Sequence, residues 1–517
     1  MRLLAQSGFG LPVPHRRTFA TGILPCAHSM LTTLARAPPL GHPGCACQQR
    51  RLNGARVAQS GFGLPVPRRR TFATGILPCA HSMLTTLRHP GCACQQRRLP
   101  GHGAPEASVW TNVVSVPTHL PYSGCMPAIP HHAYVHVPFC RHRCGYCDFT
   151  LVAGRDDLID RYFAAVAREL QRVEHVIAPG VGSARLKNPA CLQVATLYLG
   201  GGTPSHLGPT GLRRLFGLFA GRLVPDATAE VTVEANPLDV TPDLVAAFRE
   251  LGVTRVSLGA QSLDAATLRV LDRDHGPDDV RWAVGLLQAA GFAVNVDLMI
   301  AAPGQMLAEV ARDLDALVAL APEHVSVYCL TWEQGTAFES RRKKGLVAPV
   351  EEGLEREMFE AVIDRLEAAG FEHYEVSNFA QPGFRCRHNE AYWDCRPWEA
   401  FGPGAARFDG RARVTNHRGT LAWMSKVLAG EDATGDIDAM TDEQAARERI
   451  VVGLRRRDGL DREAFQAASG FSLDKLAGPA ITRWVERGLA TDDDARVRLT
   501  RTGLLVSDAL WADVLTG

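Results

Sequence analysis

Residues 132–149 have the sequence HAYVHVPFCRHRCGYCDF, a short apolar run followed by three closely spaced cysteines. The β-branched run Ala133–Val137 predicts a buried strand. Cys140, Cys144 and Cys147 then follow on one loop, where three thiols can converge on a single metal centre. Thiolates favour zinc or iron–sulfur clusters.

The cysteine triplet admits three interpretations. A structural zinc ion normally has four protein ligands, so His136 or His142 would have to complete the set. Three thiolates on a [4Fe–4S] cluster instead leave one iron open to a small molecule. The third interpretation is three unrelated buried cysteines.

Outward from this stretch, β-branched runs alternate with longer amphipathic segments. The expected strands are Ala133–Val137, Ala195–Leu199, Glu230–Glu234, Arg255–Gly259, Ala293–Ile300 and His324–Leu330. The expected helices between them include Leu158–Glu174, Pro277–Ala290 and Ala308–Leu320. This alternation is typical of βαβ units and a parallel sheet. We therefore expect an α/β fold, a partial (β/α)6 barrel over residues 131–380, with its reactive face at the carboxyl ends of the strands.

Polar and glycine-rich motifs follow several of these strands. The run Leu199-Gly-Gly-Gly-Thr-Pro-Ser205 lets backbone N–H groups approach a polar ligand, but it is neither a GxGxxG motif nor a P-loop. Four polar residues lie at or just beyond later strand ends: Glu234, Gln261, Arg273 and Asp297. Because an acid in an apolar run is costly to bury unpaired, Asp297 should meet a cation or hydroxyl groups. Taken singly, each of the four also fits an internal salt bridge or a strand cap.

Together these motifs resemble the radical S-adenosylmethionine (SAM) superfamily, whose signature is Cys-x₃-Cys-x₂-Cys with an aromatic residue before the last cysteine. The resemblance implies a radical-SAM barrel in which Cys140, Cys144 and Cys147 hold a [4Fe–4S] cluster. The SAM contacts that it implies are Tyr134, Tyr146, Gly201, Gly202, Thr203, Glu234, Gln261, Arg273 and Asp297. One departure is Ala301-Ala-Pro-Gly-Gln305, which stands where the porphyrin-related branch usually has Gly-Leu-Pro-Gly-Gln.

Within the superfamily, residues 133–515 resemble the HemW family of haem chaperones and the related oxygen-independent coproporphyrinogen III oxidases, the HemN type. The oxidases have a further cysteine two residues after the third cluster cysteine, where this chain has Phe149. The resemblance therefore implies a haem chaperone that passes haem to an acceptor haemoprotein. The alternative is an oxidase that decarboxylates coproporphyrinogen III through a deoxyadenosyl radical.

The segment 381–432 carries the motif His388-Asn-Glu-Ala-Tyr392-Trp393, which resembles the HemW family motif. A neutral imidazole is a good axial ligand for haem iron, and the two aromatic side chains offer flat apolar surface, so haem is expected near His388, Tyr392 and Trp393. The alternative is that His388 hydrogen-bonds within a loop while the aromatic residues pack the core. Ala406 stands where relatives often have histidine.

The amino-terminal segment differs in composition from the rest of the chain. The 517 residues carry a net charge of +1, but residues 1–105 hold 13 arginines and no acid, so the remainder has a net charge of −12. Residues 5–34 recur as 58–87 with a single change. We expect residues 1–130 to be a disordered basic extension; a transit peptide and a metal-binding segment are the alternatives.

The last segment, 433–517, predicts a small winged-helix-like α+β domain. Helices are expected over Thr441–Leu454, Asp474–Gly488 and Arg501–Leu515, with a hairpin over Leu489–Leu499. The acidic body and the absence of a basic recognition face predict no nucleic-acid partner, and no apolar stretch is long enough to span a membrane. An oxygen-labile cluster requires a reducing compartment, which predicts the cytoplasm, or the mitochondrial matrix if the extension is a transit peptide.

Overall fold

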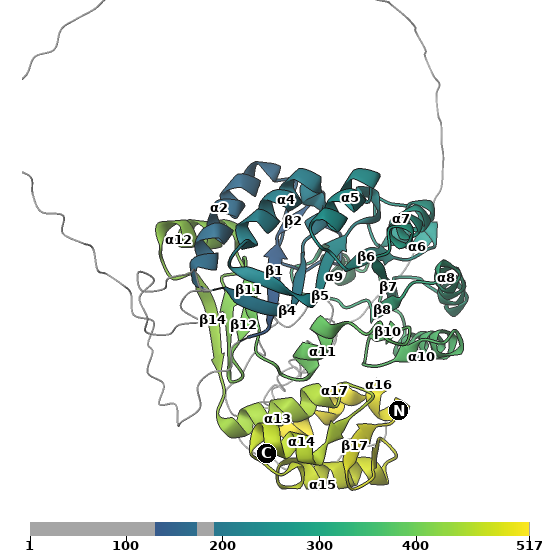
Figure 1. Ribbon diagram of the computed structural model, residues 1–517. Helices are drawn as coiled ribbons and strands as arrows, with labels where there is room; N and C mark the ends of the chain where they lie inside the picture. Colours follow the sequence, from purple (N-terminus) through teal and green to yellow (C-terminus); the bar gives the residue numbers. More distant parts are fainter. Residues whose placement is uncertain (1–129, 173–190, 516–517) are drawn as a thin grey trace, which may run out of the picture. The chain divides into compact units, whose positions relative to one another are not determined.

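The computed structural model describes residues 130–172 and 191–515 of the chain (Figure 1). Six strands form the centre of its main sheet in chain order: β1 (His132–Val137), β4 (Leu192–Gly201), β5 (Leu223–Ala235), β6 (Arg255–Gln261), β7 (Ala293–Ile300) and β8 (His324–Cys329). Each strand pairs in parallel with the next. The predicted α/β fold and all six predicted strands are therefore confirmed.

Helices connect successive strands and lie along the outer side of the sheet, as Figure 1 shows. They are α2 (Ile159–Glu169), α4 (Gly208–Phe219), α5 (Pro242–Glu250), α6 (Ala265–Val270), α7 (Pro277–Ala289), α8 (Leu307–Leu320) and α10 (Glu352–Ala368). A further helix, α9 (Ala337–Lys343), follows β8, and short 3₁₀ turns cover Asp156–Leu158, Leu170–Arg172, Pro204–Leu207 and Pro237–Asp239.

The strands combine an apolar outer face with a polar inner face. In β7, Val294 and Val296 belong to the main hydrophobic core, whereas Asn295 and Asp297 hydrogen-bond to each other on the opposite face. This follows from the two-residue period of a strand. The inner face can therefore carry polar groups within a sheet whose outer face is packed against helices.

Three short strands extend the main sheet beyond the six predicted ones. The strand β11 (Glu399–Phe401) pairs in parallel with the edge of β1 that faces away from β4. At the opposite edge, β10 (Asn378–Ala380) pairs antiparallel with β8, and β9 (Glu372–His373) pairs with β10. Two or three residues are too few to show a strand period, so the sequence pattern did not predict these strands.

The segment 381–432 is largely structured. Besides β11 it holds α11 (Arg387–Trp393), β12 (Ala406–Phe408), β13 (Ala412–Asn416) and α12 (Thr420–Ala429). The strands β12 and β13 form a second sheet with β14 (Thr434–Ala439).

The carboxyl-terminal residues form a small α+β domain with its own core, which includes the buried Trp484 and Trp511. Its helices are α13 (Asp442–Gly453), α14 (Arg462–Ser469) and α15 (Leu473–Glu486), and its sheet is built from β15 (Leu460–Asp461), β16 (Ala490–Asp492) and β17 (Arg496–Leu499). The single helix expected over 501–515 is instead divided into α16 (Arg501–Leu505), α17 (Ser507–Leu510) and α18 (Ala512–Leu515). The division begins at Val506, whose φ of −116° is not helical.

The predictions for residues 1–129, including the disorder and the duplicated segment, lie outside the described residues. Within the described ranges, no helix is long and apolar enough to cross a membrane.

An Ala301→Gly variant is expected to raise the free energy of unfolding by about 1 kcal/mol, because a left-handed backbone is strained for any residue with a Cβ. Ala301 follows β7 with a φ of +60°, at the position where the resembling branch usually has glycine. Denaturant unfolding measures the change. The neighbouring Ala302 is the control, since it is buried and outside the left-handed region, so glycine there should destabilise. Destabilisation by Ala301→Gly would contradict the assignment of strain.

A second expected result concerns acid stability. Burial lowers the pKa of His373 to about 4, and its ring stacks on Phe379 at 4.3 Å. Because the unfolded histidine binds a proton below about pH 6.5 and the folded one does not, stability is lost as the pH falls from 6.5 towards 4. A His373→Phe variant should remove up to about 1.4 kcal/mol per pH unit from this slope. Urea unfolding at pH 7, 6 and 5 checks the prediction, and an unchanged slope would contradict it.

Candidate functional site

The carboxyl ends of the parallel strands surround one cavity. It is lined by eleven of the twelve residues predicted to hold the cluster and SAM: Cys140, Cys144, Tyr146, Cys147, Gly201, Gly202, Thr203, Glu234, Gln261, Arg273 and Asp297. The twelfth, Tyr134, lies lower in β1, and its hydroxyl is 3.1 Å from Nδ1 of His136. Most of these residues converge because they lie at or just beyond strand ends, and parallel strands end at one edge of the sheet. Asp297 is an exception, since it lies within β7.

The cysteine loop is held at both of its ends. The two-residue strand β2 (Phe139–Cys140) pairs in parallel with β3 (Val152–Ala153), so the intervening residues are forced over the strand ends. Thr203 Oγ1 lies 3.2 Å from the Cys140 sulfur, and Arg273 donates to the Cys144 sulfur at 3.3 Å.

The thiols of the cysteine loop lie in surroundings that disfavour their charged form. Burial raises the pKa of Cys140 to about 11 and that of Cys147 to about 12. A bare thiolate is therefore disfavoured in this loop, and a metal centre is the group that deprotonates such thiols.

The structure also bears on the choice between zinc and a cluster. Within residues 130–172 and 191–515, no group of three or more His, Cys, Asp or Glu side chains is placed to hold a single ion. In a cubane cluster each thiolate binds a different iron, so the three sulfurs need not meet at one point. Of the two histidines that would complete a zinc site, His136 has its Nε2 2.6 Å from the Thr150 carbonyl. His142 has its Nε2 2.9 Å from the Asp272 carbonyl and 3.6 Å from the Cys144 sulfur. Three thiols on one loop are a donor set that fits a [4Fe–4S] cluster with one open iron.

The glycine run lies directly against the strand that leads to the cysteines. Gly202 donates its N–H to the Val137 carbonyl at 2.8 Å, and a Cβ on Gly202 would lie 2.7 Å from the Phe139 carbonyl oxygen. Gly201 has a φ of +111°, and a Cβ there would lie 2.4 Å from the His136 ring. Only glycine fits at these two positions. Their N–H groups donate within the protein, from Gly201 to Glu234 and from Gly202 to Val137.

A Gly202→Ala variant is therefore expected to bind SAM at least about tenfold more weakly, because the methyl group would displace the loop from β1. Equilibrium dialysis of cluster-loaded protein measures the affinity. The control is Gly285→Ala on the exposed face of α7, where a Cβ meets nothing within 4 Å and alanine should stabilise the helix. Equal SAM affinity in the two variants would contradict the prediction.

Two buried carboxyl groups lie at the cavity floor. Glu234 accepts hydrogen bonds from the Tyr198 hydroxyl at 3.0 Å and from the Gly201 N–H at 2.9 Å, and burial with the nearby Asp297 raises its pKa to about 8. Asp297 accepts from the Asn295 amide at 2.8 Å, and burial raises its pKa to about 6. Such carboxyl groups gain most from a ligand that brings positive charge or hydroxyl donors.

Two further features suit a zwitterionic ligand with hydroxyl groups. Arg273 donates a hydrogen bond from one terminal nitrogen to the Gly259 carbonyl and from the other to the Cys144 sulfur. Its buried Nε has no hydrogen-bond partner. Gln261 has a φ of +66° where the register of β6 on β7 shifts, a strained backbone of the kind found at functional sites. The unpartnered nitrogen of Arg273 and the two buried carboxyl groups are groups that a zwitterionic ligand with hydroxyl groups would pair with.

The side chains predicted to lie near haem are interior. His388 is 1% exposed, with Nδ1 2.7 Å from Thr196 Oγ1 and Nε2 3.0 Å from the Tyr392 hydroxyl. Tyr392 and Trp393 belong to a buried aromatic cluster that also contains Tyr198. Burial lowers the pKa of His388 to about 3, so its imidazole is neutral, but both ring nitrogens are occupied. Iron ligation by His388 would require the loss of one of these hydrogen bonds.

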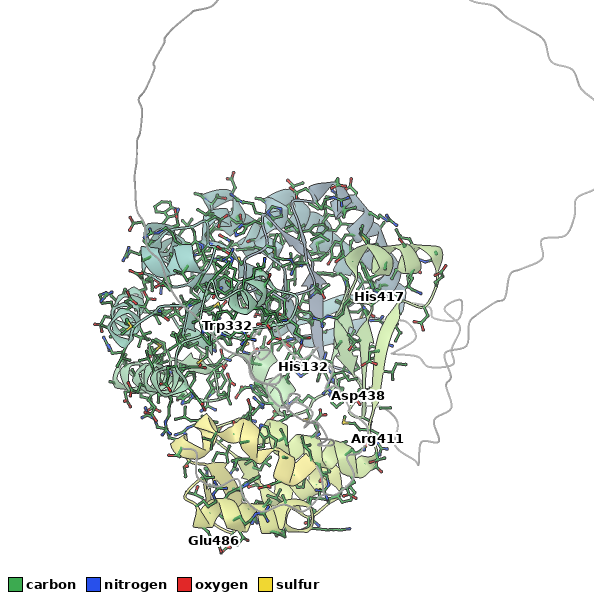
Figure 2. All side chains as sticks on the ribbon, turned by 180° about the vertical axis from the view of Figure 1, so that it is seen from behind. His132, Trp332, Arg411, His417, Asp438 and Glu486 are labelled. Carbon is green, nitrogen blue, oxygen red and sulfur yellow. The ribbon has the colours of Figure 1, made fainter. Side chains whose placement is uncertain are left out.

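A second cleft lies on the other side of α11 and was not predicted. It is lined mainly by charged and imidazole side chains, among them His131, His132, Arg387, Arg396, Glu390 and Arg456. They come from residues between 131 and 456, and no local pattern connects them. In Figure 2, His132 marks the start of β1, beside this cleft. Trp332, labelled in the same figure, follows β8 and packs against Phe338 of α9, which also contacts Tyr146 of the cysteine loop.

Comparisons with known proteins agree with this fold. The model of the Radical SAM superfamily matches residues 134–317, and that of the HemN C-terminal domain matches residues 440–506. "Heme chaperone HemW" of Mycobacterium tuberculosis is 36% identical over 77% of this chain and 98% of its own length. The protein of the same name from Lactococcus lactis is 33% identical over 75% of this chain and 97% of its own length. A bovine relative, "Radical S-adenosyl methionine domain-containing protein 1, mitochondrial", is 31% identical over 74% of this chain and 87% of its own length.

Among solved structures, coproporphyrinogen III oxidase (HemN) from Escherichia coli matches with a TM-score of 0.66. The match covers 76% of this chain and 92% of that chain at 20% identity. At this identity the likeness concerns the fold.

Proposed function

The chain belongs to the HemW family of the radical SAM superfamily, and from that membership we propose that it is a haem chaperone that binds haem and transfers it to an acceptor haemoprotein. The observation that carries the proposal is the match to HemW proteins over nearly their whole length. Phe149 supports the same choice, since the oxidase branch has cysteine at that position.

The superfamily implies a [4Fe–4S] cluster and SAM. We propose Cys140, Cys144 and Cys147 as the cluster ligands. When bound, the cluster would supply an open iron that chelates SAM and an electron for reductive chemistry. Around it, Gly202 and Thr203 would form the cavity wall against SAM, while Glu234 and Asp297 would orient its amino and ribose groups. The remaining proposed contacts are Tyr134, Tyr146, Gly201, Gln261 and Arg273.

The haem site is proposed at α11, with His388 as the candidate axial ligand and Tyr392 and Trp393 as its apolar neighbours. Iron ligation by this residue would have to open the interior and release the hydrogen bond to Thr196 or to Tyr392. For location we propose the cytoplasm; relatives named mitochondrial also exist.

The test is an anaerobic haem titration of the cluster-loaded full-length protein, followed by addition of apomyoglobin. We expect a saturable Soret band at one haem per chain and its transfer to apomyoglobin, with a weaker band in a His388→Ala variant. Failure of the wild-type protein to bind haem would refute the proposal. Formation of 5′-deoxyadenosine together with vinyl-bearing porphyrinogen, after addition of SAM, reductant and coproporphyrinogen III, would instead establish the oxidase.

A further inference from the structure

The floor of the SAM cavity is joined to α11 by direct side-chain contacts. Tyr198 of β4 donates its hydroxyl to Glu234 at 3.0 Å, and the ring of the same tyrosine stacks on His388 at 5.1 Å with an angle of 29° between the rings. Thr196, two residues earlier on the same face of β4, lies 2.7 Å from His388 Nδ1. His388 is therefore fixed on the inner face of β4 directly beneath the tyrosine that holds Glu234.

A second chain of hydrogen bonds connects α11 to the other carboxyl group of the cavity. The Cys386 N–H, at the start of α11, donates to the Tyr374 hydroxyl at 3.4 Å, and that hydroxyl lies 2.8 Å from His324 Nε2. Nδ1 of the same imidazole is 2.6 Å from Asn295 Oδ1, and the Asn295 amide donates to Asp297 at 2.8 Å. Each group in this order can donate to the next, which strengthens the chain as a whole.

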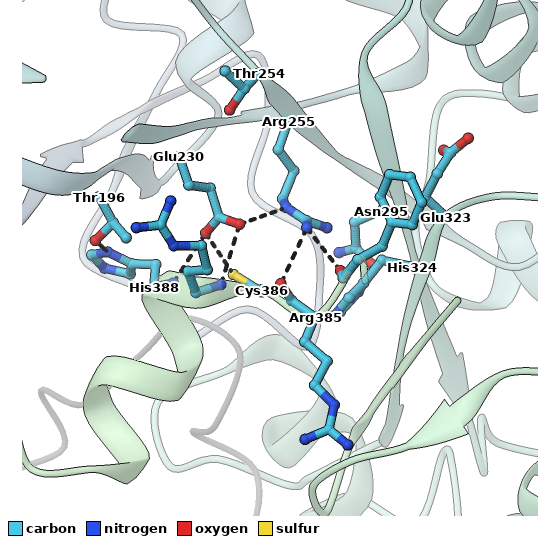
Figure 3. Close-up of polar contacts among 12 residues, drawn as sticks. Thr196, Glu230, Thr254, Arg255, Asn295, Glu323, His324, Arg385, Cys386 and His388 are labelled. Atoms are coloured by element: carbon cyan, nitrogen blue, oxygen red, sulfur yellow. Dashed lines mark hydrogen bonds and ion pairs between the residues drawn. The ribbon is translucent and has the colours of Figure 1, made fainter. Parts of the chain in front are cut away.

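The start of α11 is itself held by one buried carboxylate. Glu230 of β5 accepts the backbone N–H groups of Arg387 and His388, at 3.2 and 3.0 Å, and the thiol of Cys386 at 3.4 Å (Figure 3). This anchoring leaves His388 little freedom, because its backbone and both ring nitrogens are bonded. A side chain fixed in this way can hold a neighbour in place.

We propose that His388 is a positioning residue of the SAM site: it fixes the ring of Tyr198, and through the tyrosine hydroxyl it sets the place of Glu234. The inference rests on the proposed function for the identity of the ligand, and it gives the motif of α11 a role that does not require haem to be bound. His388 itself does not line the SAM cavity.

The experiment compares SAM affinity in His388→Ala and Tyr198→Phe variants of the cluster-loaded full-length protein. The alanine variant removes the stacking partner of Tyr198, whereas Tyr198→Phe keeps the stack and removes only the hydroxyl that Glu234 accepts. We expect each variant to bind SAM about tenfold more weakly, because a tenfold loss of affinity corresponds to the free energy of one hydrogen bond to a charged group. The double variant should lose no more than either single variant, because both act through one contact.

Two readouts separate positioning from a general loss of stability. The Tyr198 hydroxyl stabilises the Glu234 carboxylate, so its loss or displacement should raise the pKa of Glu234. In both variants SAM affinity should therefore reach its plateau at a higher pH than in the wild type. The change that SAM causes in the electron paramagnetic resonance signal of the reduced cluster should weaken in parallel. A Trp484→Phe variant, altered in the carboxyl-terminal core, is the control and should be less stable with unchanged SAM affinity and pH profile.

The outcomes are distinguishable from those of the haem experiment. Wild-type SAM affinity and pH profile in both His388→Ala and Tyr198→Phe would overturn the positioning role, whatever haem does. A wild-type protein that binds SAM but not haem would refute the chaperone and leave this inference standing if the variants lose SAM affinity. The mild Tyr198→Phe change keeps the test decisive if His388→Ala fails to fold.

Discussion

A Cys144→Ala variant is expected to retain less than about a tenth of the wild-type iron and sulfide after anaerobic reconstitution. Three thiolates are the smallest set that holds a [4Fe–4S] cluster with one open iron, so the loss of one leaves two irons without protein ligands. Cys329 also lines the cavity, but it lies at the end of β8, away from the cysteine loop that β2 and β3 hold in place. Iron and sulfide assays with the absorbance near 400 nm measure the result.

The matched control is Cys191→Ala, at the amino end of β4 and outside the cavity, which should assemble a full cluster. A full iron and sulfide complement in Cys144→Ala would defeat the assignment of the cysteine loop. Equal loss in both variants would indicate that reconstitution depends on overall thiol content.

A Glu230→Gln variant is expected to lower the free energy of unfolding by about 3 to 5 kcal/mol, the usual cost of breaking a buried ion pair from one side. Glu230 and Arg255 are 8% and 5% exposed and pair at 3.2 Å (Figure 3). The amide would leave the Arg255 charge uncompensated, and Nη1 of that arginine already lacks a partner. It would also weaken the acceptor of the first N–H groups of α11.

Denaturant unfolding under anaerobic conditions measures this change. Asp278→Asn is the control, because Asp278 forms an exposed pair with Arg281 at 2.8 Å and exposed pairs contribute little, so its stability should change by less than about 0.5 kcal/mol. If Glu230→Gln were as stable as this control, the carboxylate would not anchor α11.

The sequence was sufficient to predict the six central strands and the residues that line the cavity. Both follow from local patterns: runs such as Ala293–Ile300 are apolar and β-branched, and parallel strands bring whatever follows them to one edge. Most of the eleven lining residues converged for this reason. Tyr134 does not line the cavity, although Asp297, which also lies within its strand, does.

Other parts of the site depend on register and long-range packing. Tyr198 and Asn295 hold the two carboxyl groups of the floor, but which strand face they occupy is not evident until the strands are aligned. The surroundings of His388 come from Thr196, Tyr198 and Glu230, all more than 150 positions away in the chain. No local spacing reports such contacts, so the sequence suggested a ligand where the structure shows a fully bonded interior side chain.

The pairing of β11 with β1 has a consequence for synthesis. Ala133 pairs with Glu399, so this edge of β1 stays unpaired until the ribosome has added the 266 residues that lead to Glu399. At the usual elongation rates of about 5 to 20 residues per second, this delay is about 13 to 53 s. During that time the main-chain N–H and C=O groups of β1 remain an open template for another nascent chain. Ribosome-bound chains in which residues 399–401 have not left the exit tunnel should therefore depend on chaperones more than longer chains in which these residues are free to pair.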